Sequence, residues 1–275
     1  MSAVTPELAR VKAILKHVSD TWSHVVRRHV YLSAMGTDER LRAAINFTFP
    51  GHVQNALRDV LIIDLIRSIG ALILDTDPRS ASVAVAITFL RDKKLHAELE
   101  AEYLVVPPLP PDAHDDGTPP EAREAVRAQL REHDLRRNIE VFATLVPTLD
   151  KIEREVINSD VSVAIKRARN KSVAHYDVVE DNDNWRVLKI DDSGLTFDQL
   201  DVQMQVCTEA IDTLSGLVRC AGFDFTATRN FAKKDVDQYI DALATGLRAQ
   251  RVAQEERVRA KRQEYLRRIR EHENP

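Results

Sequence analysis

The stretch VLIIDLIRSIGALIL, residues 60–74, is the most apolar run of the chain and decides the class of fold. Asp64 and Arg67 interrupt it, and the run is too short as well as too charged to cross a bilayer. It is therefore predicted to form a helix buried in a core. The sequence DTDPRS at 75–80 ends this helix, and a further helix is expected over about 79–103.

The composition favours helices in the rest of the chain as well. Of 275 residues, 44% are hydrophobic and 30% are charged, which is the balance of a globular protein, and glycines number only eight. The formal net charge of −4 provides no overall attraction to nucleic acids or to anionic membranes. Any polyanion must therefore be bound by a local patch of positive charge.

Capping signals place the helices along the chain. Thr5 followed by Pro6 is typical of a helix start, and Thr196 with Gln199 forms a capping box. Pro147 should end or kink the helix that precedes it. The expected helices cover about 5–35, 49–74, 79–103, 118–146, 160–174, 197–221 and 233–275, and a segment over about 148–157 leads into the helix at 160–174.

Two segments interrupt the helices. Residues 106–120 hold six of the eleven prolines and are predicted to form an extended surface connection, with a motif for a proline-binding partner as the alternative. Residues 183–196 combine polar turn residues with a β-branched run, which is typical of a hairpin or loop. We therefore expect an all-α, multi-helix up-down bundle over residues 1–225, with a small β-hairpin insertion, followed by a long charged helix over 226–275.

The charged C-terminal helix has only a weak heptad pattern. Apolar residues recur at Leu247, Val258 and Tyr265, but Arg251 and Arg262 occupy intervening positions of the seam. We interpret the segment as a solvated helix that docks on its own bundle or on a second copy of the chain. A dedicated RNA-binding arm is the alternative.

Most sequence signatures of enzymes and metal sites are missing. The chain has no glycine-rich phosphate loop, no dinucleotide-binding motif and no H-E-x-x-H, C-x-x-C or G-x-S-x-G pattern. His17, His24 and His29 share a helix, but their spacings of seven and five place no close pair on one face. No metal and no cofactor is therefore expected. Two separated cysteines and an N-terminus without an apolar signal segment fit a cytoplasmic protein.

The stretch RARNKSVAHYD, residues 167–177, is the strongest candidate for a functional site. No acidic residue interrupts residues 161–174, and a lone histidine, His175, follows. Helical periodicity is lost directly afterwards, so this histidine is expected at the end of a helix. The cations that crowd before it are Lys166, Arg167, Arg169 and Lys171.

An arginine followed by a histidine at this spacing is by itself a weak signal, because comparable pairs occur by chance elsewhere in the chain. Arg91 and His96 form such a pair, with Asp92 as a polar residue after the arginine, and this pair is kept as the alternative. The pair at 169 and 175 is favoured because it lies in the cationic cluster and has an amide, Asn170, directly after its arginine.

The favoured side chains suit RNA cleavage without a metal. Histidine titrates near neutral pH and can accept the proton of a 2′-hydroxyl. Arginine is always charged and its fork fits phosphate oxygens, so Arg169 suits stabilisation of the pentavalent phosphorane. With one such histidine in each chain, the acid and base roles require two chains or a substrate-assisted step.

The segment RNKSVAHYD resembles the R-x(4–6)-H signature of HEPN domains, and the similarity is greatest to the AbiU-like abortive-infection branch. The stretch RDVLIIDLIRSIGALILDTDPRSASVAVAITFL, residues 58–90, is similar to that branch's long apolar helix, aspartate and following helix that starts at a serine. The resemblance covers about residues 5–225. It implies a HEPN-like helical bundle that dimerises and, in catalytic members, metal-independent cleavage of RNA by a toxin or antiphage effector.

Residue by residue, the resemblance maps catalysis onto Arg169 and His175, with Asn170 in the supporting polar position. Some toxin members have a tyrosine two residues after the histidine, the target of nucleotide transfer by an antitoxin. Asp177 stands there instead, which argues against this form of control. The expected partners are RNA, a second copy of the chain and a cognate antitoxin or other defence protein. RNA binding is assigned to Lys166, Arg167, Lys171 and Tyr176.

Two other functions stay open. A non-catalytic HEPN scaffold would bind RNA, a nucleotide or a partner protein through the same cationic site. A helical adaptor would instead use the C-terminal helix and the proline-rich loop. Deletion of residues 248–275 distinguishes the adaptor, because a ribonuclease built on the bundle should keep its chemistry without them.

Overall fold

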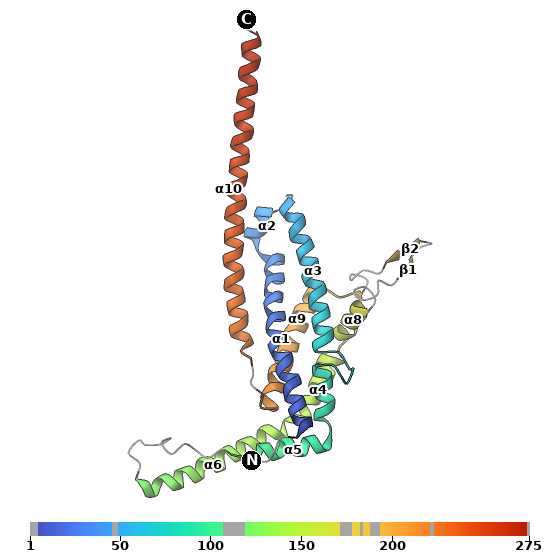
Figure 1. The fold of residues 1–275 in the computed structure, drawn as a ribbon, viewed down its shortest axis with the longest axis vertical. Helices are drawn as coiled ribbons and strands as arrows, with labels where there is room; N and C mark the ends of the chain where they lie inside the picture. The colour runs from blue at the N-terminus through green and yellow to red at the C-terminus, as the bar shows by residue number, and fades with distance from the viewer. Residues whose placement is uncertain are drawn as a thin grey trace. The chain divides into compact units, whose positions relative to one another are not determined.

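The computed structural model describes residues 5–45, 49–106, 119–170, 178–181, 184–187, 193–220 and 223–273 (Figure 1). These residues are mostly helical, which confirms the all-α fold. The elements are α1 (Pro6–Thr37), α2 (Glu39–Ile45), α3 (Phe49–Leu72), α4 (Val83–Leu90), α5 (Lys93–Tyr103), α6 (Pro120–Ala143), α7 (Leu145–Ile152), the π-helical turn η1 (Glu153–Ile157), α8 (Asp160–Ala168), α9 (Phe197–Leu217) and α10 (Phe225–Glu273).

The expected small hairpin is present, but it begins before residue 183. β1 (Val178–Asp181) pairs in antiparallel register with β2 (Asn184–Val187), so that Val178 lies opposite Val187. Valine favours a strand, and the pair Val178 and Val179 starts β1 directly after the cationic motif. Residue 183 and residues 188–192 of the predicted insertion lie outside the described residues, as do residues 107–118 of the predicted proline-rich connection.

Local capping signals predicted several helix ends correctly. The N–H of Gln199 donates to the Thr196 hydroxyl at 3.2 Å, and the N–H of Thr196 donates to the Gln199 side chain at 3.0 Å. This reciprocal pair is the predicted capping box at the start of α9. The helix before Pro147 ends as expected, because α6 stops at Ala143 and the proline lies in the first turn of α7.

Two helices start at aspartate caps that were not predicted from the sequence. The helix predicted over 79–103 is broken into α4 and α5, because the Asp92 carboxylate accepts the N–H groups of Lys94 at 2.9 Å and Leu95 at 3.1 Å. The short helix α2 was not predicted. It starts where the Asp38 carboxylate accepts the N–H of Leu41 at 3.1 Å.

The last helix begins at Phe225 rather than at residue 233. The first turns, FTATRNF, are rich in β-branched and aromatic residues, which are weak helix formers. Thr228 and Ala232 are nevertheless buried, so tertiary packing outweighs intrinsic propensity in this segment.

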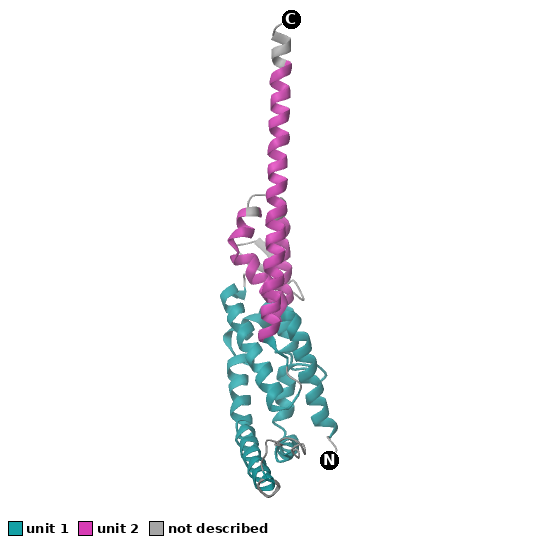
Figure 2. Ribbon diagram, turned by 90° about the vertical axis from the view of Figure 1, so that its left-hand side faces the viewer, with its two compact units in different colours: residues 1–25, 65–225 teal, residues 26–64, 226–275 magenta. Residues whose placement is uncertain are grey.

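The chain divides into two compact units (Figure 2). Unit 1 comprises residues 1–25 and 65–225, and unit 2 comprises residues 26–64 and 226–275. Each unit therefore combines segments that are distant in the sequence. The division predicted from the sequence, at residue 225, stays a prediction.

In unit 1, the residues of α1 up to Val25 pack against α9 in the core. Trp22 is fully buried, and its Nε1 donates to the Thr208 hydroxyl at 3.0 Å. The buried hydroxyls of Ser19 and Ser215 lie 3.0 Å apart, which forms a second polar link between α1 and α9. The second half of α3 contributes a buried face at helical spacing: Leu65, Ile66, Ile69 and Leu72.

Unit 2 has a smaller core in which α10 packs on α1 and α2. Arg40 of α2 adds polar links to α10, because its guanidinium lies 2.9 Å from carboxylate oxygens of both Asp237 and Asp241. The core cluster consists of Val30, Leu41, Ile45, Ala232, Val236, Ile240 and Ala244.

The apolar stretch 60–74 is only partly the buried helix that was predicted. Six isoleucine or leucine side chains of residues 65–74 are buried, but Val60 at the start of the stretch is 59% exposed. Among the described residues, the core cluster of unit 2 contains no residue of α3, and Val53 and Leu57 in the first half of this helix are exposed as well. Among the described residues, no helix combines the length and apolar character needed to span a membrane.

Candidate functional site

Helix α8 carries the cationic cluster and is anchored by a buried polar network. The Ser159 hydroxyl accepts the N–H of Ser162 at 3.2 Å and caps the start of the helix. The buried Ser162 hydroxyl donates to the carbonyl of Val156, and Nε2 of Gln203 donates to the same hydroxyl at 3.1 Å. These bonds fix α8 to η1 and to α9, which sets the direction in which its last residues leave the core.

Arg169 directly follows α8, and its side chain lies across α3 at Gly70. A Cβ atom at Gly70 would stand 2.5 Å from Cδ and 3.2 Å from Nη1 of Arg169. The guanidinium Nη2 lies 3.9 Å from Oδ2 of Asp75, which is too far for a hydrogen bond. The arginine side chain remains 33% exposed. Glycine therefore makes room for the arginine, whose guanidinium donates to no residue that the structure describes.

Asp75 is itself held in place by the loop between α3 and α4. Its carboxylate accepts the N–H of Asp77 at 3.0 Å, and its carbonyl accepts the buried Ser82 hydroxyl at 2.5 Å. Gly70 and Asp75 were not singled out from the sequence. A glycine inside an apolar helix costs about 0.5–1 kcal/mol relative to alanine, so its presence was a signal of close approach.

The other members of the cluster point in different directions. Lys166 precedes Arg169 by three residues and shares its side of the helix, whereas Arg167 lies about 160° away around the axis. Asn170 is exposed. Neither Lys166 nor Arg167 forms an ion pair with another part of the described chain. The remaining predicted site residues, Lys171, His175 and Tyr176, lie outside the described residues.

The sequence model of the HEPN AbiU2 family matches residues 8–239. The chain belongs to this HEPN family. The match includes both the apolar stretch at 58–90 and the motif at 167–177, and it ends inside α10. Membership suggests a role in defence or in RNA cleavage, and HEPN domains commonly act as dimers or in defence systems. A search of curated proteins gave no significant match, and a search of solved structures gave none either.

The alternative HEPN-type pair, Arg91 and His96, lies in a different environment. Both line a cavity of about 290 Å³ in unit 1. Arg91 forms two ion pairs, since its Nη2 lies 2.7 Å from Asp150 and 2.5 Å from Glu153. Mainly the Asp150 carboxylate, and to a smaller extent that of Glu153, raises the pKa of Arg91. A phosphate would have to displace both carboxylates. The His96 ring packs edge-on against Phe142 with centroids 4.8 Å apart, a contact between α5 and α6.

The cysteines of this HEPN chain are not suited to nucleophilic catalysis. Cys207 is buried, and desolvation raises the pKa of its thiol to about 12. Burial also raises the pKa of Cys220, so both thiols stay protonated at neutral pH. Within the described ranges, no cluster of three or more His, Cys, Asp or Glu side chains is arranged to hold a metal ion.

Proposed function

We propose that this HEPN protein is a metal-independent endoribonuclease of the cytoplasm that acts in phage defence or as a toxin, with Arg169 and His175 at its site. One observation carries the proposal: the Arg169 guanidinium is packed on α3, is partly exposed, and has its nearest described carboxylate at 3.9 Å. The guanidinium can therefore donate to a phosphate without first giving up a hydrogen-bonded partner among the described residues. Arg91, with two carboxylates in contact, cannot.

In the proposed reaction, His175 accepts the proton of a 2′-hydroxyl, and the oxygen attacks the adjacent phosphorus. The bond from phosphorus to the 5′-oxygen then breaks, which leaves a cyclic phosphate on one product and a hydroxyl on the other. Arg169 stabilises the charge of the phosphorane, and Asn170 supports the site as a polar neighbour. Lys166, Arg167, Lys171 and Tyr176 would bind the flanking RNA.

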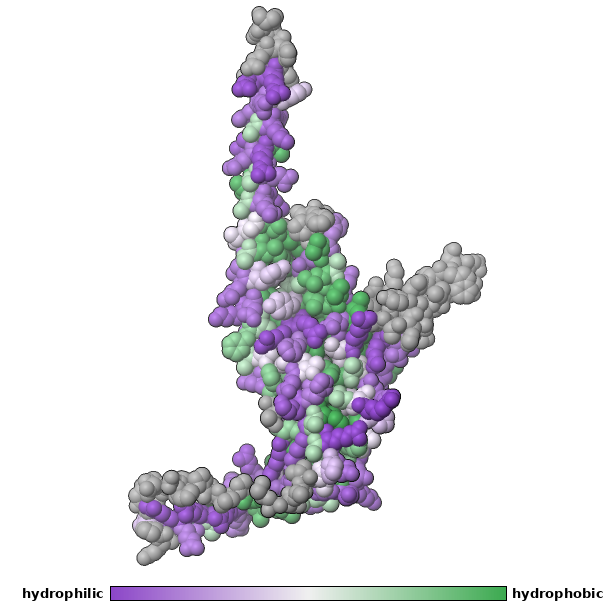
Figure 3. Space-filling view, in the orientation of Figure 1, coloured by the Kyte–Doolittle hydropathy of each residue, from purple (hydrophilic) through white to green (hydrophobic). Residues whose placement is uncertain are grey.

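The departing 5′-oxygen needs a proton, and each chain supplies only one motif histidine. A homodimer supplies the second imidazole. The first half of α3 offers an apolar face for a second copy, on which Val53, Leu57 and Val60 recur at spacings of four and three residues and are 54%, 41% and 59% exposed. Figure 3 shows hydrophobic residues gathered over this part of α3.

Charged substitutions on this α3 face are expected to give a monomer. The double change Val53→Glu and Val60→Glu places carboxylates on side chains that are already more than half exposed, so the chain itself should fold normally. Light scattering should show the mass of one chain instead of two. The control Val202→Glu alters an equally exposed valine, 62%, on α9 and should leave the dimer intact. A dimer in both variants would show that α3 is not the interface.

The purified protein is expected to cut total RNA or transfer RNA in the presence of a chelator. Scission that persists after removal of divalent cations supports the endoribonuclease. The second candidate is a non-catalytic HEPN scaffold, favoured by the fixed Asp75 carboxylate that faces the arginine. Tight RNA binding without scission would replace the first function by the second. A cognate antitoxin or other defence protein would be a partner of the endoribonuclease and of the scaffold alike.

A further inference from the structure

The end of α10 is a basic helix that the HEPN family match does not include. The match ends at residue 239, whereas α10 continues to Glu273. Residues 248–273 contain nine Lys and Arg against five Asp and Glu, a net charge of +4 in a chain whose total is −4. The other residues therefore carry −8. All side chains of residues 248–268 are exposed, so none of the charged groups among them is buried against another described element.

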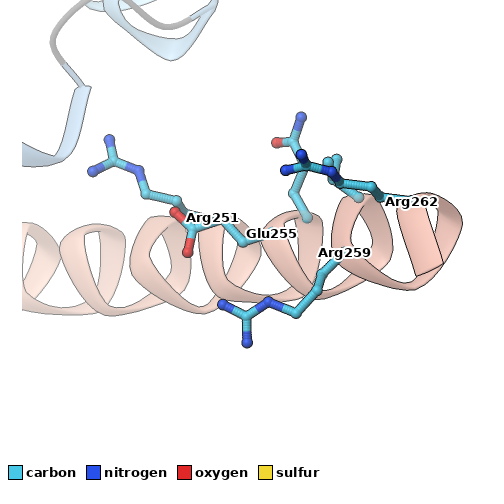
Figure 4. Close-up of a pocket in the computed structure, with 6 residues that line it drawn as sticks. Arg251, Glu255, Arg259 and Arg262 are labelled. Carbon is cyan, nitrogen blue, oxygen red and sulfur yellow. The ribbon is translucent and has the colours of Figure 1, made fainter. Parts of the chain in front are cut away.

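The charge is arranged in two stripes on this segment. At about 100° per residue, Arg248, Arg251, Arg259 and Arg262 fall within roughly 80° of one another around the axis, and we call them the arginine stripe. Glu255 is the acidic residue on this side. Figure 4 shows Arg251, Glu255, Arg259 and Arg262 along the helix, where the hollow that they line is formed by α10 alone. The arginine stripe is therefore accessible to a ligand along its whole length.

A second stripe lies on the other side of the helix and consists of Arg257, Lys261 and Arg268. Here Arg268 is already paired, with its Nη2 2.5 Å from Oε1 of Glu264. No member of the arginine stripe makes an ion pair within the described part of the chain. The two stripes therefore differ in how much positive charge each can offer to a ligand.

We propose that the arginine stripe binds the phosphate backbone of single-stranded RNA. Arginine forks onto phosphate oxygens with two hydrogen bonds, and each such contact releases counterions from the nucleic acid. The stripe rises about 21 Å from Arg248 to Arg262, enough to follow several nucleotides of one strand. The identity of the nucleic acid as RNA rests on the proposed function, whereas the phosphate contacts do not. The arginine stripe gives a chain of negative overall charge a local site that can bind a polyanion.

The test is a binding titration with the full chain and a labelled single-stranded RNA. All proteins carry His175→Ala, so that the probe is not cut. One variant adds Arg251→Gln, Arg259→Gln and Arg262→Gln, and its matched control adds Arg257→Gln, Lys261→Gln and Arg268→Gln. Both lose the same charge. We expect the stripe variant to bind roughly 50-fold more weakly near 0.15 M salt and to flatten the plot of log affinity against log salt by about 2.

Equal losses in the two variants would show that only total charge matters and would overturn the proposal, as would unchanged binding by the stripe variant. A DNA of the same sequence is measured alongside, and tighter binding of DNA than of RNA would overturn RNA as the ligand. A stripe variant that changes the oligomeric mass at unchanged RNA affinity would assign the stripe to an interface between chains instead. Because the readout is binding, an absence of RNA cleavage by the wild-type protein leaves this test decisive.

Discussion

Replacing Arg169 or His175 by alanine is expected to lower metal-free RNA cleavage about 10³-fold. In the proposed mechanism the arginine stabilises the phosphorane charge and the histidine accepts the 2′-hydroxyl proton, so removal of either side chain should raise the barrier of the chemical step. The two losses should not add fully, because both groups act on the same transition state. Initial rates on a defined RNA, at saturating substrate and with chelator present, measure the effect.

The chain contains its own control for this experiment. Arg91 and His96 have the same residue types at nearly the same spacing, but the arginine is bound to Asp150 and Glu153. Arg91→Ala and His96→Ala should keep cleavage within a few-fold of wild type. Loss of activity in this pair, with activity kept after Arg169→Ala, would move the site to the cavity at α4 and α5.

Folding should survive the change at Arg169. Its side chain is one third exposed, and its ion pair to Asp75 is long, so the contact contributes little to stability. Urea unfolding of Arg169→Ala and of the wild type should agree within about 1 kcal/mol. A much larger loss of stability would mean that the arginine mainly holds α8 on α3, which favours the scaffold over the enzyme.

The features that were predicted correctly from the sequence are those that depend on residues close together in the chain. The capping box of Thr196 and Gln199 joins residues three apart, and the helix start that it predicts is present. Asp92 is a residue type that favours helix caps, so the break was readable, but one continuous helix was predicted over 79–103. Contacts between segments that are distant in the sequence could not be predicted from it. Gly70 and Arg169 are 99 positions apart. The glycine signals that some segment comes close to α3, but nothing in the sequence identifies that segment as the one that carries Arg169.

The same limit explains the two halves of the 60–74 stretch. Both halves are equally apolar in sequence, yet the leucine and isoleucine side chains from Leu65 onward are buried and Val60 is exposed. Burial depends on which elements reach each half, and the core cluster of unit 2 is formed by α1, α2 and α10. The spacing of apolar residues predicts that a helix has an apolar face. It does not show whether this face packs against the chain itself or, as we propose for the first half of α3, against a second copy.

Gly70→Ala is expected to lower RNA cleavage about 10²-fold although the residue itself has no reactive group. The added Cβ would stand 2.5 Å from Cδ of Arg169, and a contact so short forces the side chain to move. A shift of about 1 Å in a group that must face a transition state costs on the order of 10² in rate. The site would lose its geometry while keeping every one of its charges.

A double-mutant cycle separates this displacement from a general effect on folding. Once Arg169 is alanine, Gly70→Ala should cause no further loss of activity, because the side chain that it displaces is gone. In that background it should stabilise the protein by about 0.5–1 kcal/mol through helix propensity. Gly246→Ala, with nothing within 4 Å of the new Cβ, should give the same gain at full activity. Equal activity losses from Gly70→Ala with and without Arg169 would show that the glycine acts on the fold and not on the arginine.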